Sequence, residues 1–174
     1  MQQITAVSAG LFVAWAVHDA EELVTMAATS RRVFARAPDW LPVPESLRTR
    51  GLSQTHVNLS IGLVALPMAL ASIEGVRTRG KSRWFRGALL AFGVHGFTHL
   101  ANSVAAQGYT TGVATALVIV IPYWLLARRV LRRYGLDAVD RGTTVAAIAM
   151  GPLTIGAHLV AAKLLGEKSL GPLR

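Results

Sequence analysis

Five long apolar stretches divide the chain, and polar or basic residues separate them. They fall near residues 4–29, 53–74, 84–107, 111–131 and 143–165. Each approaches or exceeds the roughly 20 mainly apolar residues that a helix needs to cross a bilayer. Polar and apolar positions do not alternate as they would in a strand, and a backbone in lipid must satisfy its own hydrogen bonds. The pattern predicts an all-α integral membrane bundle of about five transmembrane helices, in one domain covering residues 1–174.

The connections between these stretches carry most of the charge. Basic residues gather in 31–51, 77–86 and 128–141, where they can meet lipid headgroups, and Trp40 is placed at the same level. The connection at 107–112 is short and uncharged, so its two flanking spans are expected to form a tight antiparallel hairpin. The distribution of lysine and arginine favours a cytoplasmic N-terminus by ten residues to eight.

Composition agrees with a location in the bilayer. Hydrophobic residues make up 52% of the chain, and the mean hydropathy is +0.43. A net charge of +9 is common in nucleic-acid-binding proteins, but here the basic residues lie between apolar stretches and form no stripe along a helix. We therefore expect membrane lipids and no nucleic acid as partners. Cysteine is absent, which excludes disulfides, thiolate ligands and a cysteine nucleophile.

Ionisable and amide side chains interrupt the predicted spans. A charged side chain at the centre of a membrane helix costs about 2.5–3.5 kcal/mol, so these residues need an explanation. All five histidines of the chain are among them. The set comprises His18, Asp19, Glu21, Glu22, His56, Asn58, His95, His99, Asn102 and His158. Because consecutive spans run antiparallel, all these residues fall in the same leaflet. They are predicted to converge on one buried polar site.

Helical spacing sorts the polar residues of the first span. At about 100° per residue, His18, Glu21 and Glu22 share one face, while Asp19 points away from its centre. We expect Asp19 to be a hydrogen-bonding or charge-pairing residue at the edge of the site. The other three are the candidates for catalysis, and the sequence leaves open which glutamate is a ligand and which is a base.

The same spacing applies to the later spans. His95, His99 and Asn102 share one helical face. His56 and Asn58 are about 200° apart, so only one of them can point squarely at the same interior. We expect His56 to do so.

Imidazole and carboxylate together are common ligands for zinc and non-haem iron, and HxxE or HxxxH spacing presents two ligands from adjacent helical turns. The sequence therefore predicts a divalent metal, iron or zinc. The candidate ligands are His18, Glu21, Glu22, His56, His95, His99 and His158, which would suffice for two ions. Side chains expected to orient them are Asn58, Asn102, Thr25 and Thr98. For His158 alone, a hydrogen bond between helices is an equally good interpretation.

The segment His18-Asp19-Ala20-Glu21-Glu22 resembles the signature of the HXXEE-domain family, small bacterial integral membrane proteins named after this motif. The segment from His95 to Asn102 and the overall length are similar too, so the resemblance covers most of the chain. It implies that His18 and both glutamates are important, and that the protein lies in a bacterial inner membrane. The family has no settled function, so the resemblance implies no mechanism.

Four functions compete. The leading hypothesis is a metal-dependent enzyme acting on a lipid-soluble small molecule, either a di-metal oxidoreductase or, close behind it, a zinc hydrolase of esters or amides. A metal-free isomerase or cyclase could instead use histidine and glutamate for acid–base chemistry. A small proton or metal-ion transporter would need polar residues through both leaflets. In the first, third and fifth predicted spans, however, the half that lies in the leaflet opposite the polar site is almost wholly apolar. The sequence leaves the oligomeric state open.

Overall fold

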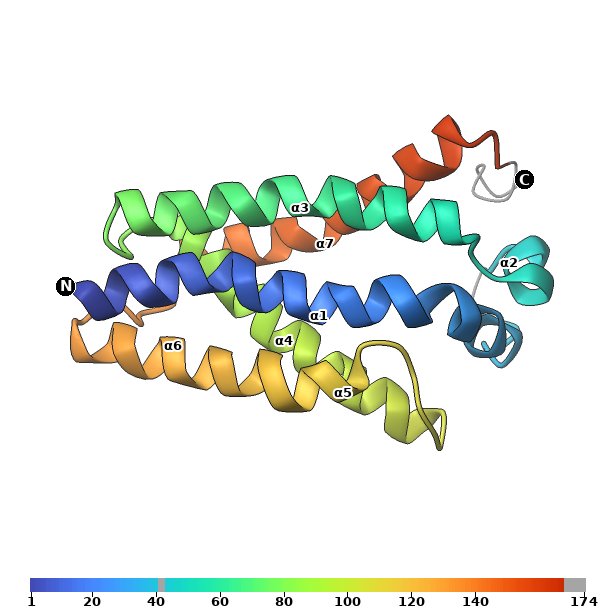
Figure 1. The fold of residues 1–174 in the computed structure, drawn as a ribbon, viewed down its shortest axis with the longest axis horizontal. Coiled ribbons are helices and arrows are strands. Elements are labelled where there is room, and N and C mark those ends of the chain that lie inside the picture. Colours follow the sequence, from blue (N-terminus) through green and yellow to red (C-terminus); the bar gives the residue numbers. More distant parts are fainter. Residues whose placement is uncertain (41–42, 168–174) are drawn as a thin grey trace.

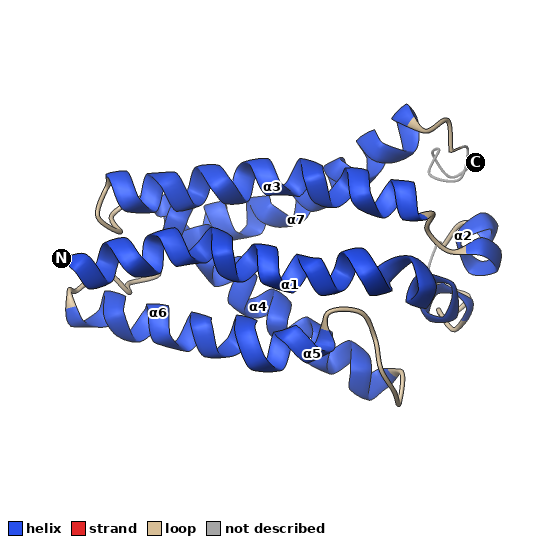
Figure 2. Ribbon diagram, viewed as in Figure 1, coloured by secondary structure: helices blue, strands red, loops and turns tan. Residues whose placement is uncertain are grey.

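A computed structural model describes residues 1–40 and 43–167, and within these ranges the chain is helical with no strand (Figures 1 and 2). The helices are α1 (Gln2–Ala35), α2 (Glu45–Arg50), α3 (Gln54–Arg77), α4 (Arg83–Ala105), α5 (Val113–Thr115), η1 (Ala116–Val120), α6 (Ile121–Arg133) and α7 (Arg141–Leu164). The prediction of an all-α fold is confirmed. Residues 41–42 of the predicted first connection lie outside the described residues.

The five predicted spans correspond to α1, α3, α4, the continuous segment from α5 to α6, and α7. Three of these are long and apolar enough to cross a membrane, namely Gln54–Arg77, Val113–Arg133 and Arg141–Leu164. The polar residues of α1 and α4 lower the hydropathy of those two helices. The structure therefore supports a membrane protein with three candidate spans, and the expectation of five is not supported.

The long helices form a bundle in which α1 packs chiefly on α3. Helix α3 lies along one side of α1 and also packs on α7 (Figure 1). Helix α6 lies along the other side of α1. Helix α4 crosses behind them and contacts α7 as well as η1 and α6. A side chain on α3 or α7 can therefore share the depth of one on α4 and still lie on a different side of the bundle.

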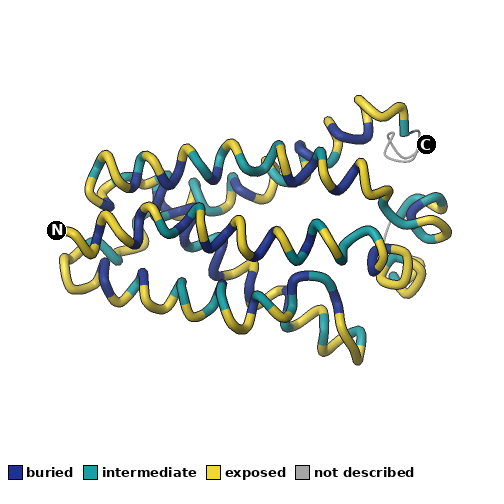
Figure 3. The backbone as a smooth tube through the Cα atoms, viewed as in Figure 1, coloured by how far each residue is buried: buried dark blue, intermediate teal, exposed yellow. Residues whose placement is uncertain are grey.

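Exposed residues occur along the whole length of the bundle (Figure 3), and many of them are large and apolar. Examples with more than half of their surface exposed are Val13, Val24, Leu66, Leu70, Val118, Leu125, Ile148 and Ile155. Inside, Leu11, Val57, Phe85 and Val120 are fully buried. An apolar outer surface of this extent is typical of a face that meets lipid.

The segment that follows the 106–112 connection changes helix type. It starts as α5, becomes the π-helix η1 over Ala116–Val120, and continues as α6 with Pro122 at its start. Proline has no N–H and crowds the preceding turn, so a wider π turn before it relieves the clash. Because η1 begins directly after Thr115, this local widening lies next to the polar residues described below.

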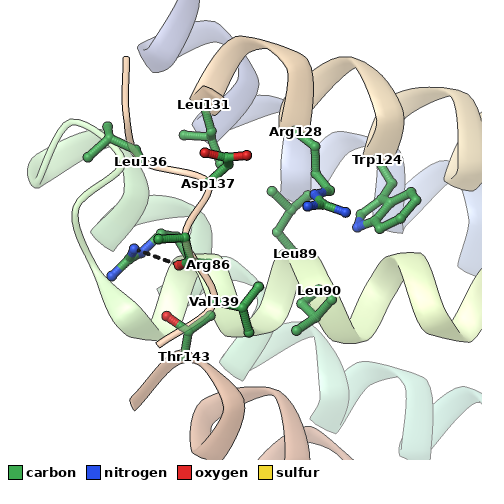
Figure 4. A pocket seen from close by; sticks show the side chains of 11 residues that line it. Arg86, Leu89, Leu90, Trp124, Arg128, Leu131, Leu136, Asp137, Val139 and Thr143 are labelled. Atoms are coloured by element: carbon green, nitrogen blue, oxygen red, sulfur yellow. Dashed lines mark hydrogen bonds between the residues drawn. The ribbon is translucent and has the colours of Figure 1, made fainter. Parts of the chain in front are cut away.

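A small cavity of about 30 Å³ lies where α4 begins and α6 ends (Figure 4). Arg86 Nη1 donates to the Ala138 carbonyl oxygen at 3.1 Å, and the Arg128 guanidinium lies 5.2 Å from the centre of the Trp124 ring. The cavity has room for little more than a water molecule. At the same end, the backbone N–H of Thr143 holds the pKa of Asp140 at about 2.

Candidate metal site

Four of the predicted ligands come together between α1 and α4. They are His18 and Glu22 on α1 and His95 and His99 on α4, each pair separated by one helical turn. One ligand atom from each of the four lies within 4.8 Å of the other three. We call this set the metal-site group. His18, Glu22 and His99 are buried, whereas His95 is exposed on the outer surface of the bundle.

His99 is oriented by the connection that follows α4. Its Nδ1 lies 2.7 Å from the Thr111 carbonyl oxygen, which can only accept, so Nδ1 carries the proton. Nε2 is then the nitrogen with the lone pair. This atom lies 3.3 Å from Glu22 Oε1 and 2.8 Å from His95 Nε2. Two imidazole nitrogens bound to one zinc ion lie about 3.3 Å apart, so His95 and His99 need only a small adjustment to share an ion.

His18 presents its other ring nitrogen in the same way. Thr115 Oγ1 donates to Glu21, so it accepts the hydrogen bond from His18 Nδ1 at 2.8 Å. His18 Nε2 is buried and has no hydrogen-bond partner among the described residues. A buried nitrogen with an unpaired lone pair is costly in a folded protein. A metal ion in this group would satisfy it.

Glu21 has a different position from the one that the sequence predicts. Its carboxylate accepts hydrogen bonds from the Thr115 hydroxyl, from the Tyr109 hydroxyl and from the backbone N–H groups of Ala114 and Thr115. Partial burial and the adjacent Glu21 raise the pKa of Tyr109, which keeps its hydroxyl protonated as a donor. Glu21 therefore holds the start of α5 against α1 and reaches His18 only through Thr115.

Gly112 is a residue of the site that the sequence did not reveal. Its φ of +76° lies in the left-handed region, and a Cβ placed there would lie 2.6 Å from His99 Cε1 and 2.9 Å from His18 Cε1. The bare backbone of Gly112 is therefore what lets both imidazoles pack against the connection. In the sequence Gly112 is one of two glycines in the connection interpreted as a tight hairpin turn, and nothing there marks it as a neighbour of the histidines.

His56 and His158 lie apart from the metal-site group, which corrects the expectation that all five histidines converge. His56 Nε2 is 3.0 Å from His158 Nδ1, and His56 Nδ1 is 2.7 Å from Glu167 Oε2. The two rings stack between α3 and α7. Antiparallel threading predicts a common depth for these residues, but it carries no information on which side of the bundle they occupy. Glu167 lies beyond the predicted fifth span and was not anticipated.

The side chains predicted to support the ligands fall into two sets. Thr25 donates to the Glu21 carbonyl oxygen at 2.8 Å and lies 2.7 Å from the Thr111 hydroxyl, so it steadies the connection that orients His99. Asn102 lines the large cavity described below.

The other predicted supporting residues lie away from the metal-site group. Thr98 is exposed and donates to the carbonyl oxygen of His95 within its own helix. Asn58 is also exposed and accepts a hydrogen bond from Gln54. Asp19 is buried but is not one of the four residues.

Replacing His56 with alanine is expected to lower the stability of the protein without affecting metal binding. The change removes a fully buried side chain and its bonds to His158 and Glu167, at a cost of about 1–3 kcal/mol. Thermal unfolding in detergent would measure the loss, with Asn58→Ala as the control on the same helix. Loss of bound metal without a change in stability would contradict this structural interpretation.

A cavity of about 510 Å³ lies beside the metal-site group, between the C-terminal ends of α1 and α4 and the 106–112 connection. His99 forms part of its wall together with Tyr109 and Thr111. Arg32 and Arg36 line it from α1. A cavity of this size is in the range that holds a small organic ligand.

Residues 9–127 match the model of a protein family described as proteins of unknown function with an HXXEE motif. The match runs from α1 into α6 and includes all four residues of the metal-site group. His158 lies outside it. No curated protein and no solved structure matches the chain.

Proposed function

Because the chain belongs to the HXXEE family, whose function is unknown, we propose its activity from the site itself: a membrane-embedded, zinc-dependent hydrolase of a lipid-soluble ester or amide. The observation that carries the proposal is the convergence of three imidazoles and one carboxylate, with His18 Nε2 buried and unpaired. Three histidines are a known ligand set of catalytic zinc.

The number of available donors favours one ion. A di-metal oxidoreductase, which the sequence placed first, would need ligands for a second metal. Glu21 is occupied at the start of α5, and His56 bonds to His158 elsewhere in the bundle. The four remaining donors are enough for a single ion and its catalytic base.

We propose further that α1 and α4 cross the bilayer with the three candidate spans, giving five transmembrane helices. Both pack within the bundle, and their polar residues face each other in the metal-site group. His95 is exposed on the outer surface, so a substrate dissolved in the membrane could reach the group from the side. The expected location is a bacterial inner membrane.

In this mechanism His18, His95 and His99 would hold a zinc ion, and Glu22 is the general base. A zinc ion bound there would polarise the substrate carbonyl and make a water molecule more acidic. Glu22 takes a proton from the water as its oxygen attacks the carbonyl carbon. Glu22 then gives that proton to the leaving oxygen or nitrogen as its bond to carbon breaks. Through Thr115, Glu21 keeps the proton of His18 on Nδ1 and leaves the Nε2 lone pair available to such an ion.

The test combines metal content with activity. Elemental analysis of detergent-purified protein, prepared without chelators, is expected to find one zinc ion per chain. Glu22→Gln should retain that zinc and lose hydrolysis of p-nitrophenyl palmitate in micelles by at least about 100-fold. Glu74→Gln, at a carboxylate bonded to Arg77 on α3, is the matched control and should change neither.

Other results would contradict the proposal in distinct ways. Two iron ions per chain would restore the di-metal oxidoreductase. If no metal is bound, the hydrolase proposal is wrong, and a metal-free acid–base isomerase or cyclase becomes the leading hypothesis. Loss of zinc in Glu22→Gln would make Glu22 a ligand and not the base.

A further inference from the structure

The large cavity beside the metal-site group has a strongly one-sided charge. Arg32 in the last turn of α1 and Arg36, the residue that caps this helix, both line it, and none of the lining residues is acidic. The nearest carboxylates described above, Glu21 and Glu22, lie behind Tyr109 and His99 of the wall. The apolar part of the wall includes Val33, Ala105 and Ala106. A space with two guanidinium groups and an apolar wall suits a molecule that is both anionic and hydrophobic.

Arg36 is fixed at the end of this cavity. Its Nη1 donates to the Ala106 carbonyl oxygen at 3.2 Å, which ties the C-terminal end of α1 to that of α4. That bond uses one of the five N–H donors of the guanidinium. The arginine is therefore already held across the cavity without losing its capacity to bind an anion.

The distance between the arginines and the metal-site group limits the size of the ligand. Ala106 follows His99 by seven residues on α4, which corresponds to about 10 Å along the helix. His99 belongs both to the cavity wall and to the metal-site group. A ligand whose anionic group binds Arg36 could thus reach the metal-site group, about two helical turns away, with the ester or amide bond that is to be hydrolysed. In an acylated glycerol phosphate, five or six bonds join the phosphorus to the ester carbonyl carbon, and these together with the hydrogen bonds from phosphate to guanidinium would span a distance of this order.

We propose that this cavity binds the phosphate group of the substrate through Arg32 and Arg36, so that the hydrolase acts on a phosphate-bearing lipid. This substrate class rests on the proposed hydrolase function. Two cationic side chains match the double charge of a phosphate monoester better than the single charge of a carboxylate. Arginine also binds phosphate with two parallel hydrogen bonds, which fixes the orientation of the ligand.

Binding of NBD-labelled phosphatidic acid in detergent micelles, followed by fluorescence anisotropy, tests the proposal. Arg32→Gln and Arg36→Gln are each expected to weaken binding about tenfold, the loss of roughly one charged hydrogen bond. Arg31→Gln removes the same charge at the adjacent position outside the cavity and should leave the affinity unchanged. NBD-labelled diacylglycerol, which lacks the phosphate, should bind at least tenfold more weakly than the phosphatidic acid.

The zinc content of every sample separates this proposal from the proposed function. Zinc binding without preferential binding of phosphatidic acid would overturn the substrate class alone. Binding of phosphatidic acid that depends on the two arginines, in a protein without zinc, would support the phosphate site and overturn the hydrolase. Equal losses in Arg31→Gln would mean general attraction to a basic surface and overturn the site. If inorganic phosphate at equal concentration displaced the labelled phosphatidic acid, the cavity would be a site for free phosphate, and the proposal of a lipid ligand would be wrong.

Discussion

Replacing His99 with alanine is expected to abolish stoichiometric zinc binding, raising the dissociation constant by more than about 100-fold. Changes to residues that merely support a ligand cost 10–100-fold, and His99 is itself a ligand in the proposed site. Its Nε2 also lies between Glu22 Oε1 and His95 Nε2, so its removal separates the other donors. The measurement is a zinc titration of metal-free protein in detergent, competed against a chromophoric chelator.

The matched control is His158→Ala, which removes an intramembrane histidine that bonds to His56. It should bind zinc as tightly as the unchanged protein. Circular dichroism of both variants would show whether the helices remain formed. If both histidine variants lost zinc equally while remaining helical, the separation of His158 from the metal-site group would be wrong. If neither lost it, the ion would bind elsewhere.

The sequence predicted the helices well, and it pointed to residues that the structure brings together, because both depend on local spacing. Apolar stretches of membrane length, a turn of 3.6 residues and ionisable groups in an apolar setting were enough to place His18, Glu22, His95 and His99 among seven candidate ligands. Their common depth followed from antiparallel threading. These arguments use only the position of each residue along the chain. They therefore predict how far along a helix a residue lies.

Rotation around the bundle could not be predicted in this way. Whether His56 faces α1 or α7 depends on which helices pack together, and this depends on contacts between residues far apart in the sequence. The different roles of the two adjacent glutamates have the same origin. Glu21 meets the start of α5, and nothing in the order of residues indicates that Thr115 would lie there. Tertiary packing, and not the motif itself, places Glu22 among the candidate ligands and Glu21 among the residues that position them.

Gly112→Ala is expected to weaken zinc binding at least tenfold although Gly112 offers no ligand atom. Alanine in a left-handed conformation costs about 1–2 kcal/mol, and its Cβ would overlap both His99 and His18. Relief of the overlap requires the connection to move, and that connection carries the Thr111 carbonyl oxygen that orients His99. The zinc titration used for His99→Ala would measure the effect.

Gly108→Ala is the matched control for Gly112, because it lies in the same connection and its nearest neighbour would be 3.9 Å from the new Cβ. It should bind zinc normally. Zinc affinity that is unchanged in both glycine variants would contradict the packing of the two imidazoles on Gly112. A loss confined to Gly112→Ala, in protein that keeps its helical content, would mean that the backbone of one glycine sets the spacing between ligands from two helices. The site would then depend on the connection as much as on the HXXEE motif, because the motif supplies donors from α1 and the connection holds those of α4 in register with them.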